Sequence, residues 1–158
     1  MAEPLADRVL KRVEQAAELY HRLVILVAPA GGGKTAAFQD IHERTAAPLI
    51  NVNLELSRRM LDLTERQRAL QLPRLLSEIV VAAATDMVLL DNVEVLFDIS
   101  LKHDPVRLLQ GLSRNKTVVA AWSGSINGEN IVYATPDHPE YRRYPVRDFL
   151  VVNSEAIT

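Results

Sequence analysis

The sequence predicts an α/β fold in which a mostly parallel, five-stranded sheet lies between two layers of helices, a three-layer sandwich. Short apolar runs alternate with longer segments of helical periodicity along the 158 residues, which is typical of a parallel sheet covered by helices. Three glycines follow the first apolar run closely, and an aspartate directly follows the third apolar run. A chain of this length fits one domain.

Five apolar runs bounded by turn-forming or polar residues are the expected strands. They are short and rich in Val, Leu and Ile, as expected for strands buried on both faces. The expected strands cover residues 23–27, 48–53, 87–90, 117–122 and 149–152. Asn127-Gly128 also predicts a hairpin turn that joins residues 122–126 to residues 131–134.

Helices are expected before and between these strands. Apolar residues recur at three- and four-residue steps over residues 5–20, which predicts an amphipathic helix. A second helix is expected over residues 34–44. Asp104 before Pro105 predicts the start of a helix that continues to Ser113, because Asp caps helices and Pro suits the first helical position.

The segment of residues 55–84 is expected to be helical, with two breaks. Thr64 with Gln67 matches a capping box, and Pro73 suits the first turn of a new helix. Most of its leucines are expected in the core and some at a subunit interface. Its arginines are interspersed with Asp and Glu, which favours a mixed, solvated face over a DNA-binding one.

Composition narrows the function classes. With 18 Lys and Arg against 20 Asp and Glu, the formal net charge of −2 provides no general basic field for nucleic acid or an anionic membrane. The absence of cysteine excludes disulfides, thiolate metal sites and thiol catalysis. The sequence begins without a secretory signal pattern, and no apolar run reaches the ~20 residues of a membrane helix. We therefore expect a cytoplasmic protein with no membrane contact, for which DNA binding is not evident.

A phosphate-binding loop is expected between the first strand and the helix that follows it. The sequence Ala28-Pro29-Ala30-Gly31-Gly32-Gly33-Lys34-Thr35 matches G-x-x-x-x-G-K-[ST], except that Ala28 replaces the first glycine. Glycines let the backbone wrap around phosphate oxygens, and amides at a helix start bind anions. The expected nucleotide-binding residues are Ala30, Gly31, Gly32, Gly33, Lys34 and Thr35. The motif predicts a P-loop NTPase that binds ATP, or another nucleoside triphosphate, with Mg²⁺.

The magnesium site is expected to combine Thr35 with Asp91. The apolar run 87–90 ends in Asp91, the form of a Walker B segment, and a buried strand brings such an aspartate to the carboxyl edge of the sheet. The hydroxyl of Thr35 is the second expected ligand. We therefore expect one P-loop NTPase domain over residues 1–158, with an N-terminal helix over residues 1–21 and a nucleotide-binding core over residues 22–153.

The hydrolytic residues are less clearly marked. Many P-loop ATPases place a glutamate directly after the Walker B aspartate, but this position is Asn92, whose amide cannot take a proton from water. Glu94 is the expected catalytic carboxylate, with Glu55 as the alternative. Ser123 is expected at the end of the fourth strand, where this class usually places a polar residue that senses the γ-phosphate.

Arginines after the hairpin predict an oligomeric site. In ring-forming AAA+ ATPases an arginine near the place of Arg142 and Arg143 reaches the γ-phosphate of a neighbouring subunit, where it stabilises developing charge; Arg114 is the alternative. We therefore expect a homo-oligomer. The sequence ends soon after the last expected strand, which favours an AAA+-like core without a lid domain.

Three stretches outside the phosphate loop resemble the BrxF family, small P-loop proteins of type 3 BREX bacteriophage-defence systems. These stretches are residues 51–59, 63–76 and 108–115. The resemblance implies a bacterial antiviral protein encoded with a large ATPase, a DNA methyltransferase, an alkaline-phosphatase-like protein and a helicase. It also implies that the phosphate loop of the family corresponds to Gly31–Thr35 and its Walker B aspartate to Asp91.

Four functions are compatible with these motifs. The first is a hydrolase that cycles ATP as a homo-oligomer in a defence complex. The second is a module that binds nucleotide without hydrolysis and changes its assembly state, which Asn92 favours. The others are a P-loop kinase, whose lid and acceptor base are not evident, and a DNA-binding adaptor, which the balanced charge does not favour.

Overall fold

The computed structural model describes residues 4–29, 33–133 and 142–154. Within these residues the chain forms five α-helices, two 3-10 helices and seven strands. The helices are α1 (Leu5–Ala16), α2 (Lys34–Thr45), α3 (Val52–Met60), α4 (Glu65–Val81), α5 (Pro105–Leu112), η1 (Val93–Phe97) and η2 (Ile99–Leu101). The strands are β1 (Leu23–Ala28), β2 (Leu49–Asn51), β3 (Met87–Asp91), β4 (Thr117–Asn127), β5 (Asn130–Tyr133), β6 (Arg142–Pro145) and β7 (Leu150–Asn153). The predicted α/β class is confirmed.

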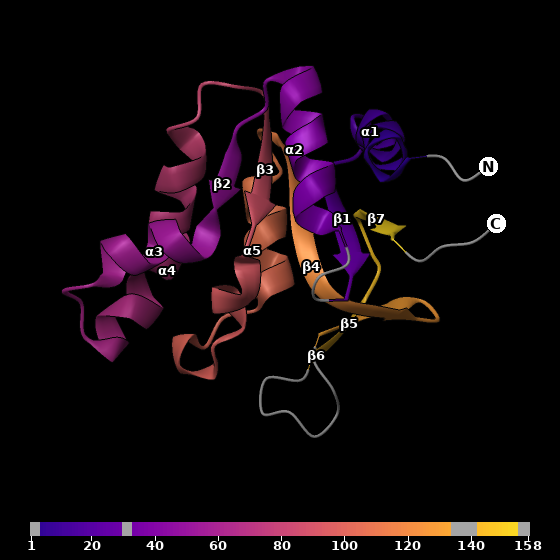
Figure 1. Ribbon diagram of the computed structural model, residues 1–158. Coiled ribbons are helices and arrows are strands. Elements are labelled where there is room, and N and C mark those ends of the chain that lie inside the picture. The colour runs from indigo at the N-terminus through magenta and orange to yellow at the C-terminus, as the bar shows by residue number, and fades with distance from the viewer. Residues whose placement is uncertain (1–3, 30–32, 134–141, 155–158) are drawn as a thin grey trace.

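The main sheet is parallel. Its strands lie in the order β2, β3, β4, β1 and β7, and each neighbouring pair is parallel. β1 lies between β4 and β7, and all six of its residues are buried. A central strand with both faces covered has no solvent-facing side, which explains its continuous apolar sequence. All five strands point their carboxyl ends toward one edge, the lower edge in Figure 1.

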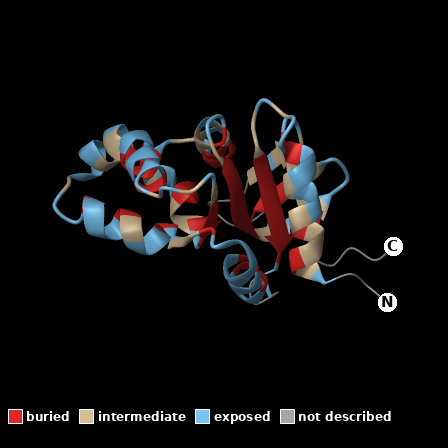
Figure 2. Cartoon of the chain, turned by 90° about the horizontal axis from the view of Figure 1, so that it is seen from above, coloured by how far each residue is buried: buried red, intermediate tan, exposed pale blue. Residues whose placement is uncertain are grey.

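Helices cover both faces of the main sheet, as the three-layer prediction requires. On one face Val24 and Leu26 of β1 pack in a buried cluster with Phe38 of α2 and with α1. On the other face Ile25 of β1 belongs to a cluster with Leu72 of α4 and with residues of α3 and α5. Figure 2 shows the central strands almost wholly buried, while the helices turn exposed faces outward. None of the described helices is long and apolar enough to cross a membrane.

The sheet has seven strands instead of the predicted five. β4 continues past Trp122 to Asn127, where β5 pairs with it in antiparallel orientation, and β6 pairs with β5. We call these residues, 124–133 and 142–145, the antiparallel extension. Gly128, with φ of 63°, and Glu129 form its two-residue loop, next to the predicted turn. The extension lies at the lower end of the sheet in Figure 1, at the same end as the start of α2.

The second strand is shorter than predicted. β2 ends at Asn51 and not at residue 53, because the Asn51 side chain accepts a hydrogen bond from the Leu54 amide (3.0 Å) and caps α3. Asn53 already lies in the first turn of α3.

Only one of the two predicted breaks in the segment 55–84 is present. Thr64 caps α4 in a capping box, in which its hydroxyl accepts from the Gln67 amide (3.2 Å) and the Gln67 side chain accepts from the Thr64 amide (2.9 Å). Pro73 lies inside α4, so the prediction of a helix start there is wrong. A proline leaves the carbonyl four residues earlier without its usual N–H donor. Here His103 Nε2 donates to that carbonyl, of Ala69 (2.5 Å), so the helix continues without an unsatisfied acceptor.

The leucines and arginines of residues 52–81 divide between core and surface. Leu56, Leu72, Leu75 and Leu76 are buried, whereas the exposed fractions of Leu54, Leu61 and Leu70 are 44%, 73% and 71%. Arg58 and Arg59 form ion pairs with Glu55, and Arg74 with Glu78. These pairs support the expected mixed, solvated face.

Candidate nucleotide site

The candidate site lies at the carboxyl edge of the main sheet. β4 separates β1 from β3, so the residues that follow or end these three strands lie side by side. Ala28 at the end of β1 pairs with Ser123 of β4, and Asp91 ends β3. This is the edge at which ligands bind in open α/β sheets.

The described part of the phosphate loop has the geometry expected of its sequence. Gly33 precedes α2 in the left-handed region, with φ of 87°, a conformation that favours glycine. Lys34 is buried, and its Nζ donates to the carbonyls of Ala28 (3.4 Å) and Pro29 (3.2 Å). Ala30, Gly31 and Gly32 lie outside the described residues. Ala28 is buried in β1 and is not among the residues with positive φ, so alanine fits where the motif has glycine.

Thr35 and Asp91 meet although they are 56 positions apart in sequence. The Thr35 hydroxyl donates to Asp91 Oδ2 at 3.0 Å, and Asp91 Oδ1 accepts from the Asn92 amide at 2.8 Å. Asp91 is only 7% exposed. A hydroxyl and a carboxylate at this spacing are hard oxygen ligands, and Mg²⁺ in nucleotide sites uses one or two such protein ligands with phosphate oxygens and water. The two predicted metal residues therefore fit Mg²⁺.

Asn92 turns the chain away from the position where a Walker B glutamate would follow. Its backbone is left-handed (φ 54°, ψ 52°), its side chain is exposed, and its carbonyl accepts from the Asn53 amide at 3.0 Å. Asparagine tolerates this conformation better than most residues. The turn leads directly into η1, whose first turn contains Glu94.

Glu94 and Ser123, chosen separately from the sequence, are in contact. The Ser123 hydroxyl donates to Glu94 Oε1 at 3.0 Å. Ser123 does not end the fourth strand as predicted: it lies within β4, where pairing changes from parallel with β1 to antiparallel with β5. The alternative carboxylate, Glu55, is held by Arg58 (3.4 Å) and Arg59 (3.1 Å) on α3. The geometry therefore favours Glu94 over Glu55.

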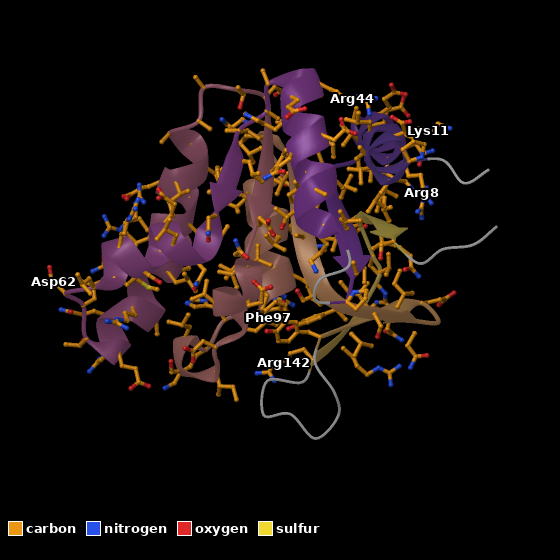
Figure 3. The ribbon with its side chains drawn as sticks, in the orientation of Figure 1. Arg8, Lys11, Arg44, Asp62, Phe97 and Arg142 are labelled. Carbon is orange, nitrogen blue, oxygen red and sulfur yellow. The ribbon has the colours of Figure 1, made fainter. Side chains whose placement is uncertain are left out.

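The candidate arginines lie at opposite ends of the molecule. Arg142 and Arg143 are on β6, in register with Tyr133 and Val132 of β5, and the Arg143 side chain is exposed. Arg142 and Phe97 both lie at the lower end of the sheet in Figure 3. Arg114 precedes β4 at the amino edge, where its guanidinium lies 5.1 Å from the ring centroid of Tyr20.

The nucleotide base has no clear partner among the described residues. Tyr20 and His21, which come shortly before β1, lie at the amino edge of the sheet with Arg114. The Nδ1 atom of His21 is 3.0 Å from the Gln110 carbonyl oxygen. The six residues of β1 separate them from the phosphate loop by about 20 Å at ~3.3 Å per residue. This placement does not favour a contact with the base of a nucleotide bound at Lys34.

Comparison with known proteins gives little further information. No family model matches the sequence, and no curated protein matches it. Among solved structures, the chain is similar to C. elegans PCH-2, with 17% sequence identity and a TM-score of 0.40 over 78% of this chain. The chain spans only 36% of the length of PCH-2. A similarity of this size shows neither a shared fold nor a shared function.

Proposed function

We propose that this chain binds a nucleoside triphosphate, ATP in the first instance, with Mg²⁺ and hydrolyses it. The observation that carries the proposal is the hydrogen bond between Thr35 and Asp91, which joins the P-loop motif to the Walker B segment. A chance glycine-rich turn gives no reason for a distant, strand-ending carboxylate to meet its threonine. Such convergence is what a magnesium–triphosphate site requires.

Each residue has a distinct role in this proposal. Lys34, whose Nζ donates to the carbonyls of Ala28 and Pro29, exchanges them for β- and γ-phosphate oxygens as a point charge. Thr35 and Asp91 would hold Mg²⁺, which would supply positive charge against the phosphate oxygens. Glu94 orients the attacking water and accepts its proton. Ser123 holds Glu94 and faces the γ-phosphate. Arg142 or Arg143 stabilises developing charge in the site of a neighbouring copy.

A second function, nucleotide binding that controls assembly without hydrolysis, is favoured by one observation. Glu94 Oε1 already accepts a hydrogen bond from the Ser123 hydroxyl, so this oxygen has a partner before any water binds. In either case, the resemblance to the BrxF family supports a cytoplasmic BREX phage-defence setting. The proposed partners there are further copies of this chain, the large ATPase, the methyltransferase and the alkaline-phosphatase-like protein.

The test is Mg²⁺-dependent ATP hydrolysis over a series of protein concentrations, with nucleotide binding measured in parallel. The variants are Lys34→Ala, Glu94→Gln and Arg142→Ala. Glu78→Gln and Arg66→Ala, exposed changes on α4, are the matched controls. The oligomeric hydrolase is supported if turnover per subunit rises with protein concentration. Turnover must also fall in all three variants and in neither control. Binding lost in Lys34→Ala with no turnover in any sample supports the assembly module. If the wild type binds no triphosphate, both proposals are wrong.

A further inference from the structure

Four aromatic side chains connect η1 to the antiparallel extension. The ring of Phe97, the last residue of η1, stacks on that of Tyr133 with centroids 3.7 Å apart and planes inclined by 11°. Its ring also meets Trp122 edge to face at 4.9 Å. Tyr144 of β6 meets Trp122 in the same way at 5.7 Å. Phe97 of η1 is therefore held by rings from β4 and β5, and Trp122 connects it to the ring of Tyr144 on β6.

Trp122 makes this cluster rigid. It is fully buried, and its indole N–H donates to the Val132 carbonyl at 3.0 Å. Gly124 lets the Val132 carbonyl lie this close to β4, because a Cβ at position 124 would lie 1.9 Å from the same carbonyl oxygen. Aromatic pairs in such arrangements contribute beyond their buried area. Trp122 and the antiparallel extension therefore form one packed unit.

Glu94 is connected to this cluster in two ways, through η1, which ends at Phe97, and through Ser123, which follows Trp122. In a 3-10 helix, residues three apart lie on the same side, so Phe97 lies directly along η1 from Glu94. Ser123, the hydrogen-bond donor to Glu94, follows Trp122 in β4. The extension is thus connected to Glu94 by two routes, the backbone of η1 and the hydroxyl of Ser123.

We propose that Phe97 and Tyr133 are positioning residues for Glu94, so that the packing of the antiparallel extension against η1 sets the rate of hydrolysis. The inference rests on the proposed function. It adds that the extension, which is also the element that carries Arg142 and Arg143, controls the catalytic carboxylate of its own subunit. A partner that shifts the extension then changes kcat with little change in nucleotide affinity.

The first test compares steady-state kinetics of Phe97→Leu, Tyr133→Leu and Tyr133→Phe with wild type. Tyr133→Phe keeps the ring, and we expect it to retain kcat. The two leucine variants should lower kcat at least about tenfold while KM stays within about threefold, because a small misplacement of a catalytic group lowers the rate of the chemical step strongly. Phe149→Leu, a buried aromatic of the same core outside the aromatic cluster, is the control and leaves kcat unchanged. Adding Phe97→Leu to Glu94→Gln lowers kcat no further if Phe97 acts through Glu94.

The second test needs no turnover. Trp122 is the only tryptophan of the chain, so its emission reports on the cluster. We expect Mg²⁺–ATP binding to shift this emission in wild type and to shift it much less in Phe97→Leu at equal saturation measured by calorimetry. The inference is overturned if the wild type hydrolyses ATP and folded Phe97→Leu has the same kcat. It is also overturned if saturating Mg²⁺–ATP binding leaves the Trp122 emission of the wild type unchanged. An emission shift without any hydrolysis would instead refute the hydrolytic part of the proposed function and leave the coupling in place.

Discussion

Gly124→Ala tests how the antiparallel extension is attached to the main sheet. Gly124 lies in β4, one residue after Ser123, and faces the Val132 carbonyl and the Trp122 indole. A Cβ at this position would lie 1.9 Å from Val132 O and 2.9 Å from Trp122 Nε1. Both distances are far inside the roughly 3.5 Å at which non-bonded heavy atoms attract each other. The backbone φ of Gly124 is not positive, so the cost comes from this contact alone.

The magnitude follows from the two groups that must move. Overpacking a core costs about 1–3 kcal/mol. Moving the Val132 carbonyl away from Trp122 leaves a buried N–H without an acceptor, which costs a further ~1–3 kcal/mol. We therefore expect Gly124→Ala to lower the free energy of unfolding by about 2–6 kcal/mol.

Urea denaturation followed by circular dichroism measures this loss. Gly111→Ala is the matched control, because Gly111 lies in α5 and a Cβ there meets nothing within 4 Å. Alanine in that helix should raise stability by about 0.4–1 kcal/mol. If Gly124→Ala is as stable as wild type, the extension does not pack against Trp122 as described, and the route from the extension to Glu94 fails with it.

Three further predictions concern other parts of the molecule. His103→Ala should lower the free energy of unfolding by about 1 kcal/mol in wild type, because the Ala69 carbonyl loses its donor. The loss should be smaller in a Pro73→Ala background, where the backbone N–H of residue 73 satisfies that carbonyl. A double-mutant cycle in urea shows whether the effects of the two substitutions add. Burial raises the pKa of Tyr144 to about 12, helped by a nearby carboxylate. Because this pKa is above that of the unfolded chain, its contribution to stability is complete below pH ~10 and is lost as the pH rises toward 12. Absorbance at 295 nm should therefore show a late-titrating component that Tyr144→Phe reduces, and an identical late component in Tyr144→Phe would contradict this. If the exposed leucines form the expected subunit interface, Leu70→Ser should shift sedimentation toward smaller species and Val81→Ser, equally exposed on α4, should not.

The sequence predicted those features that depend on neighbouring residues. β1 is an apolar run ended by Pro29 and glycines, and the start of α5 depends only on the Asp104 side chain accepting from the two amides that follow it. The capping box of α4 is local in the same way. For the site, a strand followed by glycines and Lys34 was sufficient to predict that a helix begins at Lys34.

The features that were mispredicted or missed depend on distant residues. Pro73 reads as a helix start because nothing near it shows that His103, 34 positions from Ala69, satisfies the free carbonyl. β6 lacks an apolar run of its own and exists because β5 pairs with it. The contact between Glu94 and Ser123 depends on the left-handed turn at Asn92. Asparagine directly after a strand-ending aspartate was the available signal for that turn, and we interpreted it only as a missing base.

The aromatic cluster is a feature that sequence patterns alone do not predict. Phe97, Trp122, Tyr133 and Tyr144 are spread over 48 positions, from 97 to 144, in a chain in which only 5% of residues are aromatic. Their meeting depends on the continuation of β4 beyond the parallel sheet. The predicted fourth strand and hairpin covered Trp122 and Tyr133 but neither Phe97 nor Tyr144, and such patterns carry no information on which rings stack.

The most direct test of the nucleotide site is the effect of Mg²⁺ on ATP affinity in wild type, Thr35→Val, Asp91→Asn and the double variant. Thr35 Oγ1 and Asp91 Oδ2 are 3.0 Å apart and are proposed to hold the same ion. Mg²⁺ should therefore tighten ATP binding in wild type, and either single substitution should remove most of this effect. The double variant should then lose little more than either single variant. If Mg²⁺ tightens ATP binding by the double variant as much as by wild type, Thr35 and Asp91 do not form the metal site, and the proposed function is wrong at its central point.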